Sequence, residues 1–184
     1  MIDAIKNRKS IRKFKSDAIP NSKLNSILEA ARIAPSGSNT QPWKFIIVQS
    51  RETIEKLSNV SKNQSWMKTA PMHIVAVADI SSRIKDSENL SLDETSSIFE
   101  LKQVIRDTVF SIENILLEAV NQGLDTCVVA DFTQEGVRPI LNIPKDKFVV
   151  AIITLGYADL KNNTPHNRHP LEDMVYYEKW NNLK

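Results

Sequence analysis

The sequence contains little cysteine and little glycine, and each shortage excludes a class of site. Cys127 is the one cysteine among 184 residues, so the chain can form neither an internal disulfide nor a CxxC metal or redox site. It lies in the apolar run TCVVA, which favours a buried, unreactive thiol over a nucleophile. The four glycines form neither GxGxxG nor GxxxxGK(S/T), the phosphate-binding turns of dinucleotide-binding and P-loop proteins. We predict no metal site.

The chain also lacks a strong overall charge and a long hydrophobic run. Its 24 basic and 22 acidic side chains leave a net charge of +2, too small for a field that attracts nucleic acid or anionic lipid over the whole surface. No apolar run is long enough to span a membrane, and the first residues lack the apolar core of a signal peptide. We therefore expect a cytoplasmic protein that binds neither nucleic acid nor a membrane.

What the sequence does contain is the pattern of one domain, residues 1–184. Its 41% apolar and 25% charged residues are typical of a globular protein of this length. Apolar periodicity predicts strands at 43–50, 71–79, 125–132 and 147–157, and helices at 22–34, 51–57, 100–122 and 133–141. Gly123 is expected to end the longest helix with a positive φ, and Thr133 to cap the last one. This alternation leaves α/β and α+β folds open.

Basic residues concentrate at the N-terminus. The segment NRKSIRKFK places Arg8, Ser10 and Arg12 at alternate positions, so that in an extended chain two guanidinium groups and a hydroxyl project to one side. Guanidinium groups bind phosphate oxygens in a bidentate manner. On this motif alone, a solvated basic segment is the more common interpretation. A nucleic-acid-binding arm is disfavoured because Phe14 is the one aromatic residue among these charges.

The stretch APSGSNTQPW, residues 34–43, is rich in uncharged hydrogen-bonding groups. It follows an amphipathic helical segment, precedes an apolar strand, and is bracketed by Pro35 and Pro42. Carboxamides such as those of Asn39 and Gln41 can donate and accept, and glycine allows close approach of the backbone to a ligand. From composition alone, a helix stop built from Asx-turns is the more common structure. A ligand-binding loop is the alternative.

Four segments in order resemble one family: NRKSIRKF, ILEAARIAPSGSNTQPWKFIIV, NILLEAVNQGLDTC and ITLGY followed by NRHPLEDMV. Together they make the chain similar to the nitroreductase family of flavin-dependent oxidoreductases over about residues 1–175. The resemblance implies an α+β fold with a central, mostly antiparallel sheet flanked by helices. It also implies an intertwined homodimer with FMN at the subunit interface, and a C-terminal arm, residues 170–184, that packs on the partner.

The resemblance also implies which residues bind the cofactor. Arg8 and Ser10 match positions near the phosphate and ribityl chain, and Arg12 matches a basic residue near flavin N1 and O2. The loop at 35–41 meets the ring of the flavin held mainly by the other subunit. The full set is Arg8, Lys9, Ser10, Arg12, Pro35, Ser36, Gly37, Ser38, Asn39, Gln41, Asn63, Ala130, Asp131 and Arg168. His166 stands where the family often has lysine.

The implied activity is a ping-pong transfer of hydride from NADH or NADPH, through flavin N5, to a nitroaromatic, a quinone or a similar acceptor. The cofactor supplies this chemistry, so no catalytic side chain is obligatory. Asp131 is the one candidate, since it departs from the glycine that the family commonly has near N5. The polar segment 81–98 is expected to form a surface insertion near the pocket and to influence substrate choice. A flavin-storage protein and an oxidative flavoenzyme are the alternatives.

Overall fold

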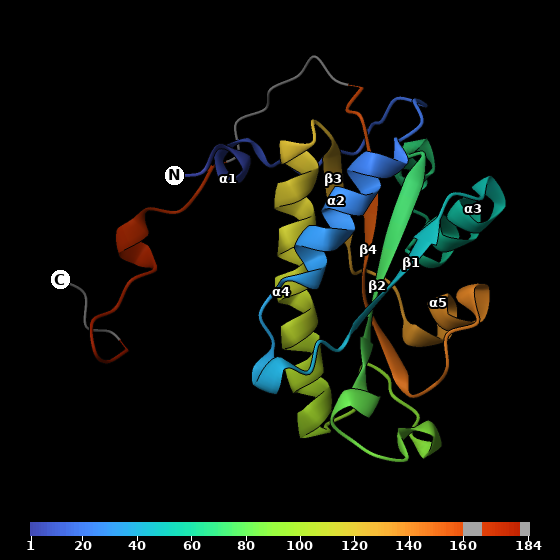
Figure 1. The fold of residues 1–184 in the computed structure, drawn as a ribbon, viewed down its shortest axis with the longest axis vertical. Helices are drawn as coiled ribbons and strands as arrows, with labels where there is room; N and C mark the ends of the chain where they lie inside the picture. The colour runs from blue at the N-terminus through green and yellow to red at the C-terminus, as the bar shows by residue number, and fades with distance from the viewer. Residues whose placement is uncertain (160–166, 181–184) are drawn as a thin grey trace.

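The computed structural model describes residues 1–159 and 167–180. Four strands form one sheet in the order β1-β2-β4-β3, and every neighbouring pair is antiparallel. The strands are β1 (Trp43–Val48), β2 (Met72–Asp79), β3 (Asp125–Val129) and β4 (Lys147–Gly156). All four predicted strands are confirmed, with shorter bounds. The antiparallel pairing decides between the two fold classes in favour of α+β (Figure 1).

Burial explains the order of the strands. β2 is apolar along most of its length and buried from Met72 to Ala78, and β4 is similarly buried over its second half. Strands without a polar face belong in the middle of a sheet that is covered on both sides. β1 and β3 are shorter and expose Lys44 and Val128, in keeping with their positions at the two edges.

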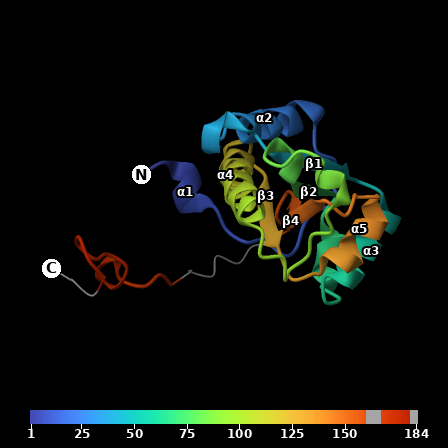
Figure 2. The ribbon, with the colours of Figure 1, turned by 90° about the horizontal axis from the view of Figure 1, so that it is seen from below.

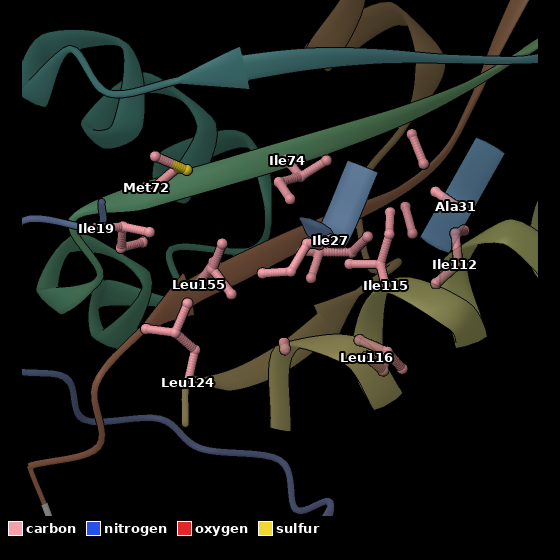
Figure 3. Close-up of a cluster of buried hydrophobic side chains, with 14 residues drawn as sticks. Ile19, Ile27, Ala31, Met72, Ile74, Ile112, Ile115, Leu116, Leu124 and Leu155 are labelled. Carbon is pink, nitrogen blue, oxygen red and sulfur yellow. The ribbon is translucent and has the colours of Figure 1, made fainter. Parts of the chain in front are cut away.

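Two helices pack on each face of the sheet: α2 (Asn21–Arg32) and α4 (Phe99–Asn121) on one, α3 (Arg51–Val60) and α5 (Gln134–Leu141) on the other (Figure 2). Figure 3 shows the core beneath α2 and α4, where Ile27 and Ile115 meet Ile74 of β2. Although α4 has 23 residues, neither it nor any other helix in the described part of the chain is long and apolar enough to cross a membrane.

The ends of two helices follow signals in the sequence. Gly123 has a φ of 71° just beyond α4, as predicted for the residue that ends this helix. The hydroxyl of Thr133 accepts a hydrogen bond from the Gly136 N–H, which confirms Thr133 as the N-cap of α5. α3 continues to Val60, beyond its predicted end, because Leu57 and Ser58 are both buried against the domain.

The polar segment 81–98 contacts the core more closely than its composition indicates. It contains most of the 3-10 turn η3 (Ile80–Ser82) and all of η4 (Ser87–Asn89). Leu92 is fully buried in a cluster with Leu101 of α4. Leu92, together with the partly buried Ile84, Leu90 and Ile98, thus holds the segment against the end of the sheet.

The N-terminal segment runs along the edge of the sheet. After α1 (Asp3–Asn7), Ser10 forms a parallel bridge with Thr126 of β3, and the Ile11 N–H donates to the Thr126 carbonyl at 2.9 Å. Phe14 then pairs with Ala158, just beyond β4. These bonds set the position of residues 8–12 relative to β3.

His73, in the middle of the sheet, is a core residue. Its side chain is fully buried, Nε2 lies 3.1 Å from the Met67 carbonyl oxygen, and Nδ1 has no hydrogen-bond partner in the part of the chain that the structure describes. Burial lowers the pKa of His73 from 6.5 to about 4, so the ring is neutral at pH 7.

This burial predicts a contribution to acid sensitivity. Between pH 6.5 and about pH 4 the unfolded chain binds a proton at His73 and the folded chain does not, so stability falls as the pH drops through this window. The shift corresponds to about 3 kcal/mol. We expect a His73→Gln variant to lose about 3 kcal/mol less stability than the wild type between pH 7 and pH 4 in urea unfolding. Equal losses would contradict this assignment.

Candidate functional site

Arg8, Ser10 and Arg12 come together around Cys127 on β3. The Cys127 thiol donates to the Val128 carbonyl, and the Ser10 side chain and the charges of Arg12 and Arg8 favour its thiolate form, which lowers its pKa. Burial is nevertheless the largest effect and raises the pKa of the Cys127 thiol, so the group stays protonated at neutral pH. Lys9 is half-buried near Asp125. The alternate spacing in the sequence therefore does bring two guanidinium groups and a hydroxyl to one place.

Trp66 orients one of these cations. The guanidinium carbon of Arg12 lies 5.7 Å from the centre of the Trp66 ring, in a cation–π contact. Trp66 belongs to η2 (Ser65–Thr69) and is half-buried beside Ile11 and Ala70. Such a contact contributes about 0.5–1 kcal/mol at an exposed site. Arg12 is thus exposed to solvent yet held over a fixed surface.

The end of β3 forms a second part of the site. Ala130 and Asp131 are exposed immediately after the strand. Lys62 Nζ lies 2.8 Å from the Asp131 carboxylate and brings the neighbouring Asn63 close to this edge. Lys62 and Asn63 both have positive φ, 53° and 54°, and both are exposed. The structure therefore links the turn that contains Asn63 to Asp131 through Lys62.

The loop at 35–41 has a strained and well-defined backbone. Ser38, Asn39 and Gln41 have φ values of 54°, 55° and 47°, although none is glycine. The Ser36 hydroxyl accepts from the Gln41 N–H at 3.0 Å, and the Gln41 carboxamide donates to the Asn39 carbonyl at 3.1 Å. All three strained residues, together with Pro35, are exposed. The loop lies beyond the end of α2 and forms its own turn, η1 (Gly37–Asn39), rather than an Asx-turn helix stop.

These two groups of residues are far apart within one protomer. The loop leads into β1, and the Arg8–Ser10–Arg12 group lies on β3, at the opposite edge of the sheet. Gly37 contacts α4 at Asp107, whereas α1 lies beside Asn121 at the other end of that helix (Figure 1). Fourteen residues of helix separate these contacts by roughly 21 Å. Within one protomer the two groups therefore lie at opposite edges of the sheet.

Arg168 lies apart from the N-terminal guanidinium groups. It is exposed, and Nη1 donates to the Asn167 carbonyl. Residues 167–180 extend away from the sheet and its helices in Figures 1 and 2, and include the short turn η5 (Leu171–Asp173). The structure does not join Arg168 to Arg8 within one protomer, and His166 lies outside the described residues. Residues 181–184 of the predicted arm also lie outside them.

Large apolar side chains are exposed over one side of the molecule. Phe99, Val109 and Phe110 of α4 are about half exposed or more, and Ile33 at the end of α2 is 66% exposed. A groove of about 590 Å³ between α1, α2 and α4 adds Leu117 to this side. The described part of the arm also exposes apolar residues, namely Leu171, Met174, Tyr177 and Trp180. Large exposed apolar side chains that gather into one surface mark an interaction site.

Three residues near the candidate site were not singled out from the sequence: Lys62, Arg83 and Asp107. Lys62 pairs with Asp131, and the other two contact Gly37. The sequence did contain a sign of the role of Asp107, because this charged residue lies on the buried face of α4, between Val104 and Ser111. Within residues 1–159 and 167–180, no three His, Cys, Asp or Glu side chains gather closely enough to hold a metal ion.

Comparison with known proteins identifies the family. The model of the nitroreductase family matches residues 5–157. This chain belongs to the nitroreductase family. A protein of Methanothermobacter thermautotrophicus, provisionally named NADH dehydrogenase/NAD(P)H nitroreductase, is 30% identical over 184 residues, which cover 98% of this chain and 87% of the relative.

Solved structures agree with this assignment. A nitroreductase family protein from Clostridium novyi NT superposes with a TM-score of 0.73 and 30% identity, over 98% of this chain and 94% of the other. An FMN-dependent nitroreductase from Clostridium difficile R20291 superposes with a TM-score of 0.79 and 26% identity, over 98% and 100%. The predicted family and its α+β nitroreductase fold are therefore confirmed.

Proposed function

We propose that this nitroreductase family member binds FMN and oxidises NADH or NADPH. The observation that carries the proposal is that this one fold presents two separate sets of hydrogen-bonding side chains, each suited to a different part of FMN. Two guanidinium groups and a hydroxyl on the β3 edge suit a phosphate and a ribityl chain. Exposed carboxamides at Asn39 and Gln41 suit a flavin edge on which carbonyl oxygens and ring nitrogens alternate. The names of the relatives from Methanothermobacter and Clostridium difficile support the donor and the cofactor.

Each part of the site has a physical role in this proposal. Arg8 and Ser10 bind the phosphate and ribityl oxygens, with Lys9 beside them. Arg12, oriented by Trp66, places a cation where negative charge develops on the reduced ring. Ala130 and Asp131 offer backbone N–H groups at the end of β3, and Asn63 reaches the ring edge from the adjoining turn. Arg168 completes the phosphate contacts when the arm is in place.

When bound, FMN would accept a hydride from NAD(P)H and pass it on to a nitroaromatic, a quinone or a similar acceptor in ping-pong order. The residues of this chain would bind, orient and stabilise charge, and water can supply protons. A single open pocket must then admit two unlike ligands in turn. Residues 81–98 border the loop through Arg83 and are therefore placed to affect acceptor choice.

The site requires two copies of the chain, so we propose an intertwined homodimer. The loop at 35–41 and the β3 edge lie too far apart in one protomer to contact one flavin, but a second copy can bring its loop to the first copy's β3 edge. Burial of the exposed side of α4, with Phe99 and Phe110, would stabilise such a dimer by the hydrophobic effect. The apolar residues of the arm, residues 170–184, would pack on the partner.

The proposed function is tested by the purified protein's visible spectrum and its response to nicotinamides without air. We expect a yellow protein whose absorbance is bleached by NADH or NADPH, and steady NAD(P)H consumption when a quinone or nitroaromatic compound is added. A yellow protein that neither nicotinamide bleaches would favour flavin storage. Substrate oxidation coupled to oxygen would favour an oxidative flavoenzyme. A colourless protein that takes up no added FMN would overturn the proposal.

Substitution of Arg8 tests the phosphate contact. Charge-assisted hydrogen bonds of this kind contribute about 1.5–3 kcal/mol, so Arg8→Ala should raise the Kd for FMN by roughly 10- to 100-fold. Lys13→Ala is the matched control, because Lys13 is a neighbouring exposed cation whose ammonium group lies 3.1 Å from Asp159 instead. Fluorescence titration of flavin-free protein measures both. An equal rise in the Kd for FMN in both variants would indicate a general effect of positive charge and would contradict a specific contact between Arg8 and the phosphate.

The Asp131–Lys62 pair predicts a change in the flavin midpoint potential. A carboxylate near the ring disfavours the anionic reduced flavin, and Lys62 at 2.8 Å offsets part of that effect. Both side chains are exposed, so the effects are small. We expect Asp131→Asn to raise the potential and Lys62→Gln to lower it, each by roughly 20 mV, about 1 kcal/mol for two electrons. Spectroelectrochemical titration measures this, and unchanged potentials in both variants would exclude Asp131 from the ring's surroundings.

A further inference from the structure

Arg83 and Asp107 together hold both backbone groups of Gly37. The Gly37 N–H donates to Asp107 Oδ1 at 3.2 Å, and Arg83 Nη2 donates to the Gly37 carbonyl at 3.2 Å. Arg83 Nη2 also lies 3.0 Å from Asp107 Oδ2, which closes the arrangement. The three residues are far apart in the sequence, one in the loop, one just beyond η3 and one on α4.

The Arg83–Asp107 ion pair is largely buried, and removing two charged side chains from water costs free energy. The side chains of Arg83 and Asp107 are only 15% and 10% exposed. Arg83 Nε has no hydrogen-bond partner among the described residues. A buried ion pair of this kind is often no more stabilising than apolar residues of similar volume. Stability of the domain alone therefore does not account for charged residues at these two positions.

The residues that follow Gly37 need such support. Left-handed backbone costs roughly 1–2 kcal/mol for each non-glycine residue, and Ser38, Asn39 and Gln41 all adopt it. Strained conformations persist only where the surrounding structure over-determines them. Beyond Gly37, hydrogen bonds within residues 36–41 keep the turn closed, but they do not attach it to the rest of the domain. The contacts to Arg83 and Asp107 do.

Gly37 is the residue that permits this arrangement. A Cβ atom added to Gly37 would lie 2.6 Å from Arg83 Nη2 and 3.7 Å from Asp107 Oδ2. The guanidinium would then have to move away from the backbone that it binds. Glycine is thus needed at this position because a side chain would clash with the Arg83 guanidinium, and not because Gly37 itself has a positive φ.

We infer that Arg83 and Asp107 are positioning residues that set the orientation of the Asn39 and Gln41 carboxamides before a ligand arrives. Ordering a loop in advance lowers the entropy cost of binding. The inference rests on the proposed function, because it assigns these carboxamides to the ring edge of FMN. It also gives residues 81–98 a structural route to the flavin, since Arg83 belongs to that segment.

The double substitution Arg83→Met and Asp107→Leu tests the inference. It removes both contacts to Gly37 and leaves no unpaired charge in the interior, so the domain is expected to fold. In flavin-free protein we expect amide hydrogen exchange at residues 37–41 to rise at least about tenfold. With FMN we expect the Kd to rise at least about tenfold, which is about 1.4 kcal/mol. Arg83→Lys keeps the charge pair and the acceptor for the Gly37 N–H, and should bind FMN more tightly than the double variant.

Lys147→Met is the matched control. Lys147 is a half-buried cation paired with Asp79 at 2.8 Å and Asp146 at 2.6 Å, and its side chain makes no bond to the loop. This variant should lose stability while keeping wild-type exchange at residues 37–41 and wild-type FMN affinity. A folded double variant with wild-type loop exchange and wild-type affinity would overturn the inference.

Two further outcomes are separated by the same design. If the double variant does not fold, Gly37→Ala provides the test, because its added Cβ would displace the Arg83 guanidinium from the Gly37 backbone. Wild-type FMN affinity in that variant would contradict the inference. If the wild type itself takes up no FMN, the proposed function fails. Loop exchange in flavin-free protein still decides whether Arg83 and Asp107 position the turn.

Discussion

The order of strands in the sheet keeps the two groups of predicted binding residues apart within one protomer. β1 and β3 lie at opposite edges because β2 and β4, apolar on both faces, occupy the centre. The chain enters β1 through the carboxamide loop, and the N-terminal segment is paired with β3. A ligand that contacts both must therefore be shared between two copies. In the proposed dimer, the apolar side chains that α4 exposes, Phe99, Val109 and Phe110, are where the two copies would meet.

The fold could be predicted from the sequence to a large extent. β2 is a continuous apolar run, α4 has a long periodic face, and Gly123 and Thr133 mark helix ends, so local pattern and tertiary structure agree. The alternation of strands and helices did not decide between α/β and α+β, because pairing direction depends on contacts between distant segments. The family resemblance implied the answer that the structure confirms.

The details of the site were less predictable, for two physical reasons. Left-handed backbone at Ser38 and Gln41 cannot be inferred from residues that usually avoid it, since it is imposed by the surrounding structure. The partners of Gly37 and Asp131 are separated from them by 46 to 70 positions, so no local pattern joins them. Spacing alone predicted only that Arg8, Ser10 and Arg12 share one side of an extended segment; their assignment to a cofactor came from the family resemblance.

The central claim is that each flavin is held by the β3 edge of one copy and the carboxamide loop of another. Mixing two separately defective variants, Arg8→Ala and Asn39→Ala, tests it most directly. After unfolding and refolding together in equal amounts, half of the dimers should be mixed, each with one intact site. If the sites are shared, a quarter of them should recover wild-type FMN affinity and NAD(P)H oxidation. No recovery above the average of the two variants, with mixed dimers shown to form, would contradict it.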